Sequence, residues 1–313
     1  MPVSIIVINL DRDSSRLQHM RTQLDRASLP FRRFSAVNGA ALPPTLTRYF
    51  DTKDKSLSAG EIGCYASHLS IFEDIASGAI AAPALVLEDD VELPTDFARL
   101  LERLLAVLPA DWDIVRLSYP SKRAALQAGQ IDPAHELVRY SQTPVSTGAY
   151  LINRAGAEKM LRPAPRNIPI DHDLRRVWAW KLKTFGVAPP PVRADALGVS
   201  SIVAMAPGAR AERWRSKRIK RQRARETWAR FTYGLADFGA LRWIGVELLN
   251  ALGRTVPRHA RTRLFAWAQR AWGWRTFDST QVELTPSHIH AVGALPDAAH
   301  AHWRRTLRRG GRS

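Results

Sequence analysis

The stretch Ala84-Leu-Val-Leu-Glu-Asp-Asp90 is a short apolar run that ends in three consecutive acids. An apolar run of this length without polar alternation is typical of a strand buried on both faces. In sheets covered by helices, ligands bind beyond the carboxyl ends of such strands. The stretch therefore predicts a strand inside an α/β domain and a candidate site at Glu88, Asp89 and Asp90.

The sequence on both sides of this stretch alternates strand and helix patterns. Strand patterns occupy residues 3–9, 31–36, 84–87, 114–117 and 148–152. Helical patterns occupy residues 11–27, 59–76, 97–108, 156–160 and 171–183, and Ser58 with Glu61 matches a capping box at the start of the second. Alternation of this kind predicts a mostly parallel sheet with helices packed on its faces.

The three acids repel one another unless a cation or hydrogen-bond donors compensate them. In an extended backbone alternate side chains share a face, so Glu88 and Asp90 are expected to point together. Carboxylate oxygens of this kind suit Mg²⁺ or Mn²⁺, with phosphate oxygens completing the coordination shell. The alternative interpretation is a solvated acidic turn.

A second motif runs from Gly60 to His68 and reads Gly-Glu-Ile-Gly-Cys-Tyr-Ala-Ser-His. Glycines near a helix start allow another group to approach the backbone, and free N–H groups there attract anions. Ser67 and His68 follow one turn later. The alternative for His68 is a core or capping histidine with its hydrogen bonds satisfied, and for Cys64 a small buried apolar residue.

Two further polar clusters follow predicted strands or begin predicted helices. Asn9-Leu-Asp-Arg12 lies at the end of the first strand, where it can hold a nucleotide or simply cap a helix. Asp171-His-Asp173 offers two carboxylates and an imidazole for a general base or a metal ligand. The same triplet also suits a helix N-terminus, where the helix dipole favours acids.

Taken in order, these motifs resemble glycosyltransferase family 25, the lipopolysaccharide-type galactosyltransferases. The matching segments are Ile6-Val-Ile-Asn-Leu-Asp-Arg12 with Arg16, Phe34-Ser-Ala-Val-Asn-Gly39, Gly60–His68, Leu85-Val-Leu-Glu-Asp-Asp-Val91, Thr147-Gly-Ala-Tyr-Leu-Ile152 and Asp171. The ordered set is far more specific than any single motif, and it covers roughly residues 3–202. The remaining C-terminal residues carry no motif of the family.

The resemblance implies a GT-A-like fold, a UDP-sugar donor with galactose as the expected sugar, a divalent metal (Mn²⁺ or Mg²⁺) and transfer with inversion. The acceptor would be a lipopolysaccharide, a lipooligosaccharide or another surface glycan. The acidic stretch reads Glu-Asp-Asp rather than Asp-x-Asp, which leaves the metal ligand open. The implied assignments are metal binding by Glu88 and Asp90, base catalysis by Asp171 with Asp173 as second candidate, and donor binding by Asn9, Arg12, Arg16, Asn38, Gly63, Ser67, His68 and Asp89.

The charge of the chain divides it into two regions. The 313 residues carry a formal net charge of +17, but residues 1–204 hold 24 Lys and Arg against 22 Asp and Glu, whereas residues 205–313 hold 22 against 7. Seven of the ten tryptophans also lie in the second region. We therefore predict a catalytic domain over residues 1–204 and a basic, mainly helical appendage over residues 205–313.

Arginine and tryptophan together suit an anionic membrane interface, because the rings settle at headgroup depth and the guanidinium groups meet phosphate. With one cysteine and no visible secretory signal, the sequence favours a cytoplasmic protein that is peripheral at the inner face of the cytoplasmic membrane. A solvated, partly disordered tail is the alternative. No nucleic acid is expected as a partner, because no nucleic-acid-binding motif accompanies the charge.

Two other functions use the same features. A metal-dependent nucleotidyltransferase or phosphohydrolase would need the same acids but no sugar acceptor. A nucleic-acid- or membrane-binding protein would use the basic region and keep the α/β domain as a scaffold. The near-neutral charge of residues 1–204, which hold every candidate motif, argues against the second of these.

Overall fold

The computed structural model describes residues 3–51, 56–121, 123–164, 166–193 and 217–255, together with residues 263, 267, 270 and 273–275. Residues 1–277 form one compact unit. This unit therefore does not end at residue 204, where the charge pattern placed the end of the catalytic domain. The segment 205–216, Trp214, Trp272 and the basic residues after 277 lie outside the described residues.

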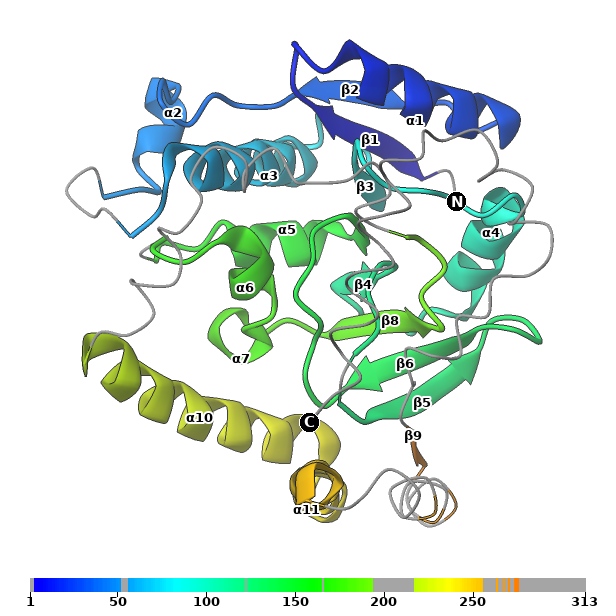
Figure 1. Cartoon of the computed structure of the whole chain (residues 1–313), viewed down its shortest axis with the longest axis vertical. Coiled ribbons are helices and arrows are strands. Elements are labelled where there is room, and N and C mark those ends of the chain that lie inside the picture. Colours follow the sequence, from blue (N-terminus) through cyan, green and yellow to red (C-terminus); the bar gives the residue numbers. More distant parts are fainter. Residues whose placement is uncertain are drawn as a thin grey trace, which may run out of the picture. The chain divides into compact units, whose positions relative to one another are not determined.

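A mixed nine-stranded sheet forms the centre of this unit, in the order β2-β1-β3-β7-β4-β8-β6-β5-β9 (Figure 1). Its strands are β1 (Ser4–Asn9), β2 (Arg32–Ser35), β3 (Ala84–Glu88), β4 (Ile114–Arg116), β5 (Ala125–Gln130), β6 (Glu136–Tyr140), β7 (Ala149–Ile152), β8 (Thr184–Ala188) and β9 (Trp274–Arg275). The pairs β1–β2, β1–β3 and β4–β8 are parallel, and the others are antiparallel. The expectation of a mostly parallel sheet is therefore wrong. The antiparallel pairs arise from β7, which returns between β3 and β4 in the opposite direction, and from β6, β5 and β9 at one edge of the sheet.

The helices agree with the sequence patterns except at residues 171–183. They are α1 (Ser14–Arg26), α2 (Pro44–Thr47), α3 (Ala59–Ser77), α4 (Phe97–Val107), α5 (Arg154–Met160), α6 (Ile170–Leu174), α7 (Val177–Trp180), α10 (Lys217–Phe238) and α11 (Ala240–Thr255). The single helix predicted over 171–183 is wrong, because the chain breaks after Leu174, forms α7 and then turns into β8.

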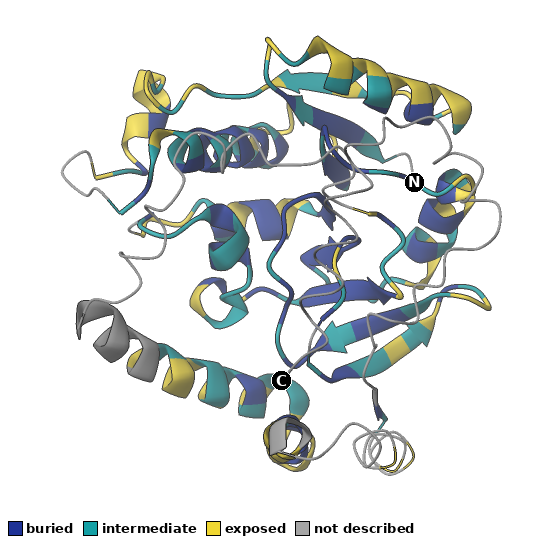
Figure 2. Ribbon diagram, viewed as in Figure 1, coloured by how far each residue is buried: buried dark blue, intermediate teal, exposed yellow. Residues whose placement is uncertain are grey.

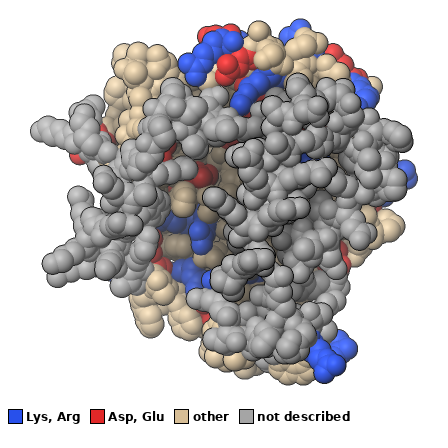
Figure 3. Space-filling view, viewed as in Figure 1, with Lys and Arg blue, Asp and Glu red and all other residues tan. Residues whose placement is uncertain are grey.

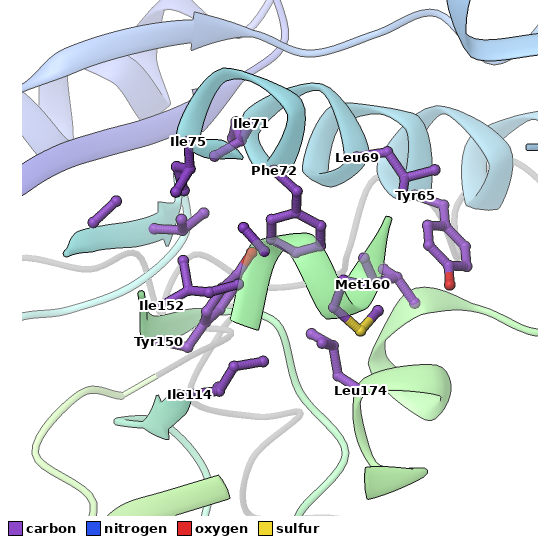
Figure 4. Packing of buried hydrophobic residues seen from close by; sticks show 14 of the residues in the cluster. Tyr65, Leu69, Ile71, Phe72, Ile75, Ile114, Tyr150, Ile152, Met160 and Leu174 are labelled. Carbon is purple, nitrogen blue, oxygen red and sulfur yellow. The ribbon is translucent and has the colours of Figure 1, made fainter. Parts of the chain in front are cut away.

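Alternate residues of the central strands build two apolar cores. Helix α3 with α5 and α6 covers one face of the sheet, and α1 with α4 covers the other (Figure 1). Buried residues follow the central strands and much of α3 (Figure 2). In the α3-side core, Phe72 points from α3 toward Tyr150 and Ile152 of β7 (Figure 4). Because strand side chains alternate, residues in register with Tyr150 on its neighbours lie on this same face.

The start of α3 is built as the sequence predicts. The Glu61 backbone N–H donates to the Ser58 hydroxyl, and the Ser58 N–H donates to the Glu61 carboxylate at 2.8 Å, so the capping box is confirmed. Gly63, one turn later, allows a close backbone contact, since a Cβ there would lie 2.5 Å from the Val37 carbonyl oxygen. The Val37 N–H also donates to the Ser67 hydroxyl at 2.8 Å. The loop after β2 is thereby held against α3.

Helix α10 is attached to the sheet domain by ion pairs and a hydrogen bond. Glu226 pairs with Arg176 at 3.0 Å, and Asp237 pairs with Lys183 at 2.7 Å. The Tyr233 hydroxyl donates to the Leu182 carbonyl at 2.8 Å. Residues 217–238 therefore belong structurally with the domain that carries the candidate site.

Tryptophans of the C-terminal region divide between core and surface. Trp243 and Trp274 pack in a small core beside Ala124 of the sheet domain and are 2% and 0% exposed. Trp228 and Trp267 keep 69% and 48% exposure. Trp274 is therefore not available to a membrane, which corrects the expectation that the tryptophans of this region meet a membrane interface. Among the described residues, no helix is both long and apolar enough to cross a bilayer.

Candidate active site

The carboxyl ends of β1 and β3 are joined by a hydrogen-bonded polar cluster. The Asn9 amide donates to Asp89 Oδ2 at 2.7 Å, and Arg16 donates to Asp89 Oδ1 at 3.2 Å. Arg16 also lies 3.7 Å from Asp90 Oδ2. Asn9, Asp89 and Asp90 are buried. Four residues that the sequence analysis selected separately thus meet at one edge of the sheet, which is where ligands bind in α/β folds.

Glu88 lies beside this cluster in a different environment. Burial of its carboxyl group and the charge of nearby Asp90 raise the pKa of Glu88 to about 7, while a hydrogen bond from Thr147 acts in the opposite direction. Asp171 is a further source of the upward shift, so its carboxylate is close enough to influence Glu88. These closely spaced negative charges repel one another, and a bound divalent cation would neutralise that repulsion.

His68 connects α3 to this acidic cluster. It is 1% exposed, its Nδ1 is hydrogen-bonded to the Tyr150 hydroxyl at 2.7 Å, and its Nε2 lies 4.0 Å from Glu88 Oε1. Burial, and secondarily the charge of Arg116, lower the pKa of His68 to about 3, so its imidazole is neutral at pH 7. A neutral imidazole held at one nitrogen offers the other to a metal or a substrate hydroxyl.

The residues present fit a divalent cation. Glu88 and Asp90 supply oxygens, and ligand atoms of Cys64, His68 and Glu88 lie within 4.8 Å of one another. Burial raises the pKa of the Cys64 thiol, so without a metal the thiol is protonated. Asp89 is engaged by Asn9 and Arg16, and Asp90 does not belong to the group of close ligand atoms formed by Cys64, His68 and Glu88.

The two acids at the start of α6 differ completely in their surroundings. Asp171 is partly exposed, accepts a hydrogen bond only from the adjacent His172 N–H among the recorded contacts, and influences Glu88 electrostatically. Asp173 is 0% exposed and accepts hydrogen bonds from the Tyr65 hydroxyl at 2.5 Å and the Trp180 indole at 3.0 Å. Asp173 therefore acts as a structural carboxylate, and its selection as a second candidate base is not supported by this arrangement.

Four residues predicted to bind the donor are placed elsewhere or used internally. Arg12 is largely exposed and pairs with neighbouring Asp13 at 3.9 Å, and the exposed Asn38 side chain accepts a hydrogen bond from the Ala40 N–H in its own turn. The Ser67 hydroxyl donates to the Gly63 carbonyl at 2.8 Å and is fully buried. Gly63 and Ser67 therefore serve to pack the loop after β2 against α3.

Arg116 and Tyr140 were missed by sequence reasoning. Arg116 ends β4 on the α3 side of the sheet and lies opposite Tyr150 in register. The Arg116 guanidinium carbon lies 5.9 Å from the Tyr150 ring centroid. A lone arginine in an apolar strand gives no pattern to detect, because its neighbours come from other strands.

Comparison with known proteins agrees with the order of these elements. The family model of Glycosyltransferase family 25 (LPS biosynthesis protein) matches residues 3–174, more than half of the chain. The chain belongs to glycosyltransferase family 25. The matched segment contains Asn9, Arg16, His68, the three acids and Asp171.

Curated members of family 25 align with the same part of the chain. The human protein named inactive glycosyltransferase 25 family member 3 is 32% identical over 189 residues, which cover 54% of this chain and 31% of that protein. Procollagen galactosyltransferase 1 of zebrafish (Danio rerio) is 27% identical, and procollagen galactosyltransferase 1-A of Xenopus laevis is 29% identical; each match covers 54% of this chain and 30% of the relative. The chain thus spans about a third of the length of these relatives.

Proposed function

We propose that this family 25 member is a glycosyltransferase that moves a hexose from a UDP-sugar to a hydroxyl group of a surface-glycan acceptor, with inversion. The proposal rests on one observation above the others. The cluster of Asn9, Arg16 and Asp89 meets Glu88 and Asp90 at the ends of β1 and β3. Some relatives carry names that call them inactive, so family membership alone does not decide activity, whereas a complete acidic cluster supports it.

In this proposal the nucleotide lies beside β1 and the sugar beside β7. Arg16 and Asn9 hold the Asp89 carboxylate in place, and Arg16 offers positive charge to the donor diphosphate. Glu88 and Asp90 would hold Mn²⁺, which supplies charge neutralisation for the leaving UDP. Galactose is the expected sugar by resemblance to the galactosyltransferases of the family, and a related hexose would need only small changes in the pocket.

Asp171 is the proposed general base. It begins α6 on the face of the sheet that carries Glu88, and it has no internal ion pair among the recorded contacts. A carboxylate in this position takes the proton of the acceptor hydroxyl as that oxygen attacks the sugar from the side opposite the leaving group. Base removal typically costs a factor of 10²–10⁴.

An Asp171→Asn variant is therefore expected to bind UDP as the wild type does and to transfer sugar about a hundredfold more slowly. The amide keeps the hydrogen bond to the His172 N–H, so the start of α6 is preserved. Calorimetric titration with UDP and a transfer assay at saturating donor measure the two quantities. Unchanged transfer would remove Asp171 from the mechanism.

A membrane-bound acceptor is supported by α11. Leu241, Ile244, Leu248 and Leu252 recur at helical spacing and are 90%, 46%, 58% and 48% exposed. An exposed apolar stripe next to a strongly basic region is typical of a helix that lies in the interface of an anionic membrane. We include peripheral binding to the inner face of the cytoplasmic membrane in the proposal.

The double variant Leu241→Glu/Leu248→Glu is expected to lose at least about tenfold in binding to vesicles that contain anionic phospholipid, because it removes two exposed apolar side chains that would enter the bilayer and adds repulsion. Co-sedimentation with phosphatidylglycerol-containing vesicles measures this. The control is Val107→Glu on α4, because Val107 is exposed, whereas the nearby Leu105 packs on a core. Equal binding of the Leu241/Leu248 variant and the wild type would exclude α11 as the membrane contact.

The activity is tested with purified protein and a panel of UDP- and GDP-sugars, each with Mn²⁺, Mg²⁺ or chelator. Slow, metal-dependent release of UDP from one donor is the expected result. Release of phosphate or of a nucleoside monophosphate instead of UDP would favour a phosphohydrolase or nucleotidyltransferase. A folded protein that neither binds nor turns over any donor would contradict the proposal.

A further inference from the structure

The Arg116 guanidinium group is buried without a hydrogen-bond partner. Arg116 is 1% exposed, and none of its Nε, Nη1 and Nη2 atoms has a partner within the residues that the structure describes. The comparably buried Arg166 differs, since it donates to the Tyr65 hydroxyl at 3.1 Å and to the Met160 carbonyl at 2.6 Å. Removing a guanidinium from water without replacing its hydrogen bonds is costly, so such a residue points to an anionic ligand.

Arg116 faces the candidate site. Ile114, two residues earlier on β4, belongs to the α3-side core, so strand alternation puts Arg116 on the same face. Burial lowers the pKa of Arg116, and Asp171 and Glu88 are among the groups that act in the opposite direction, so both carboxylates are near it. Within the part of the chain that the structure describes, neither carboxylate forms an ion pair or a hydrogen bond with the guanidinium group. The two acids are therefore neighbours of Arg116 without being its partners.

Two tyrosines flank the guanidinium group. Tyr150 lies opposite Arg116 on β7, and Gly186 lies opposite it on β8. The Tyr140 hydroxyl lies directly over Gly186, since a Cβ at residue 186 would be 1.8 Å from it. Burial raises the pKa of Tyr140, and the charge of Arg116 acts in the opposite direction, so the two groups are close. Neutral phenols next to a guanidinium group are hydrogen-bond donors suited to an anion.

The position of Arg116 separates it from the expected nucleotide. Asn9, Arg16 and Asp89 lie at β1 and β3, whereas β4 is two strands further along the sheet, beyond β7. The donor diphosphate belongs near Asp89 and Asp90, so the anion at Arg116 is carried by the sugar side of the reaction. This step rests on the proposed function.

We propose that Arg116 binds an acidic substituent, a carboxylate or a phosphate monoester, on a sugar that occupies the active site. A planar guanidinium group matches both anions with paired hydrogen bonds. The substituent belongs either to the transferred sugar or to the acceptor glycan. In both cases the enzyme prefers an acidic sugar to its neutral counterpart.

The first test is the stability of Arg116→Met in the absence of substrate. Methionine replaces the aliphatic part of the side chain and removes the unpartnered charge, so the melting temperature is expected to rise by about 2 °C or more. Arg99→Met, at an exposed position of α4, is the control and should leave it unchanged. A fall in the melting temperature of Arg116→Met would show that Arg116 has a structural partner, which would overturn the proposal.

The second test measures binding by calorimetry with matched acidic and neutral ligands. UDP-galacturonate against UDP-galactose tests the transferred sugar. Galacturonate and galactose 6-phosphate against galactose, with UDP and Mn²⁺ present, test the acceptor side. In one of the two comparisons the acidic ligand is expected to bind the wild type at least about tenfold more tightly. Arg116→Met should abolish that preference, and Arg99→Met should keep it.

Equal affinity for acidic and neutral ligands in both comparisons, no binding of any acidic ligand, or a preference that survives in Arg116→Met would each overturn the assignment. The outcome is separate from that of the donor assay. An acid preference without UDP release would contradict the proposed glycosyl transfer and leave Arg116 as an anion-binding residue. UDP release without an acid preference would support the proposed glycosyl transfer and contradict the role of Arg116 as an anion-binding residue.

Discussion

Asp90→Asn is expected to abolish UDP release, with a loss of about a thousandfold or more, because a metal ligand contributes several kcal/mol of charge stabilisation to the departing diphosphate. The substitution keeps the size of a side chain that is 6% exposed, so the fold should survive. Removing one of the crowded charges also relieves repulsion with Glu88. A UDP-release assay over a Mn²⁺ titration, together with thermal unfolding, measures both effects.

The control for this prediction is Asp96→Asn. Asp96 precedes α4, is exposed and makes no side-chain capping bond, so its substitution should leave turnover unchanged. Wild-type turnover in Asp90→Asn with an unchanged Mn²⁺ requirement would remove Asp90 from the metal site. In that case His68, Cys64 and Glu88, whose ligand atoms lie within 4.8 Å of one another, would be the remaining ligand set.

Asp173→Asn is expected to lower the free energy of unfolding by about 3–5 kcal/mol, because it breaks a fully buried ion pair and leaves a cation behind. Asp173 lies 3.7 Å from Arg166, and both side chains are 0% exposed. It also accepts hydrogen bonds from the Tyr65 hydroxyl and the Trp180 indole, which tie α3, α6 and α7 together. Denaturant unfolding monitored by fluorescence measures the loss.

The matched control for stability lies two residues earlier on the same helix. Asp171→Asn changes the same functional group at a partly exposed position and should cost less than about 1 kcal/mol. The double variant Asp173→Asn/Arg166→Met removes the orphaned cation and is expected to recover part of the stability. A loss in Asp173→Asn no larger than that in Asp171→Asn would contradict the structural role of this carboxylate.

The sequence predicted the central part of the sheet because local patterns there agree with tertiary structure. Buried strands such as β1 and β3 are apolar except at their ends, and the Ser58–Glu61 capping box needs only residues close in sequence. Strand direction was not predictable, because alternation is identical for parallel and antiparallel neighbours. The strand Ala125–Gln130 was missed since its alanines, glutamines and glycine have low strand propensity.

The same distinction applies to the candidate site. The acids at residues 88–90 could be selected from the sequence because three adjacent charges directly follow an apolar strand. Asp173 looked equivalent to Asp171 in sequence, and only the tertiary contacts with Tyr65 and Trp180 separate them. Arg116 carried no local signal, because its meaning comes from the absence of partners in a buried position within the described chain.

The small core around Trp243 and Trp274 bears on how the protein can be shortened for experiments. β9 is hydrogen-bonded to β5, and Ala124 of the sheet domain is buried in the same small core as Trp243 and Trp274. A fragment that stops near residue 204 would remove β9 from the outer edge of β5 at Ala125 and Leu126 and would uncover the apolar side chains of Ala124 and Leu126, which favours aggregation. A loss of activity in such a truncation would report damage to the fold, so the membrane contact is better removed by point substitutions on α11.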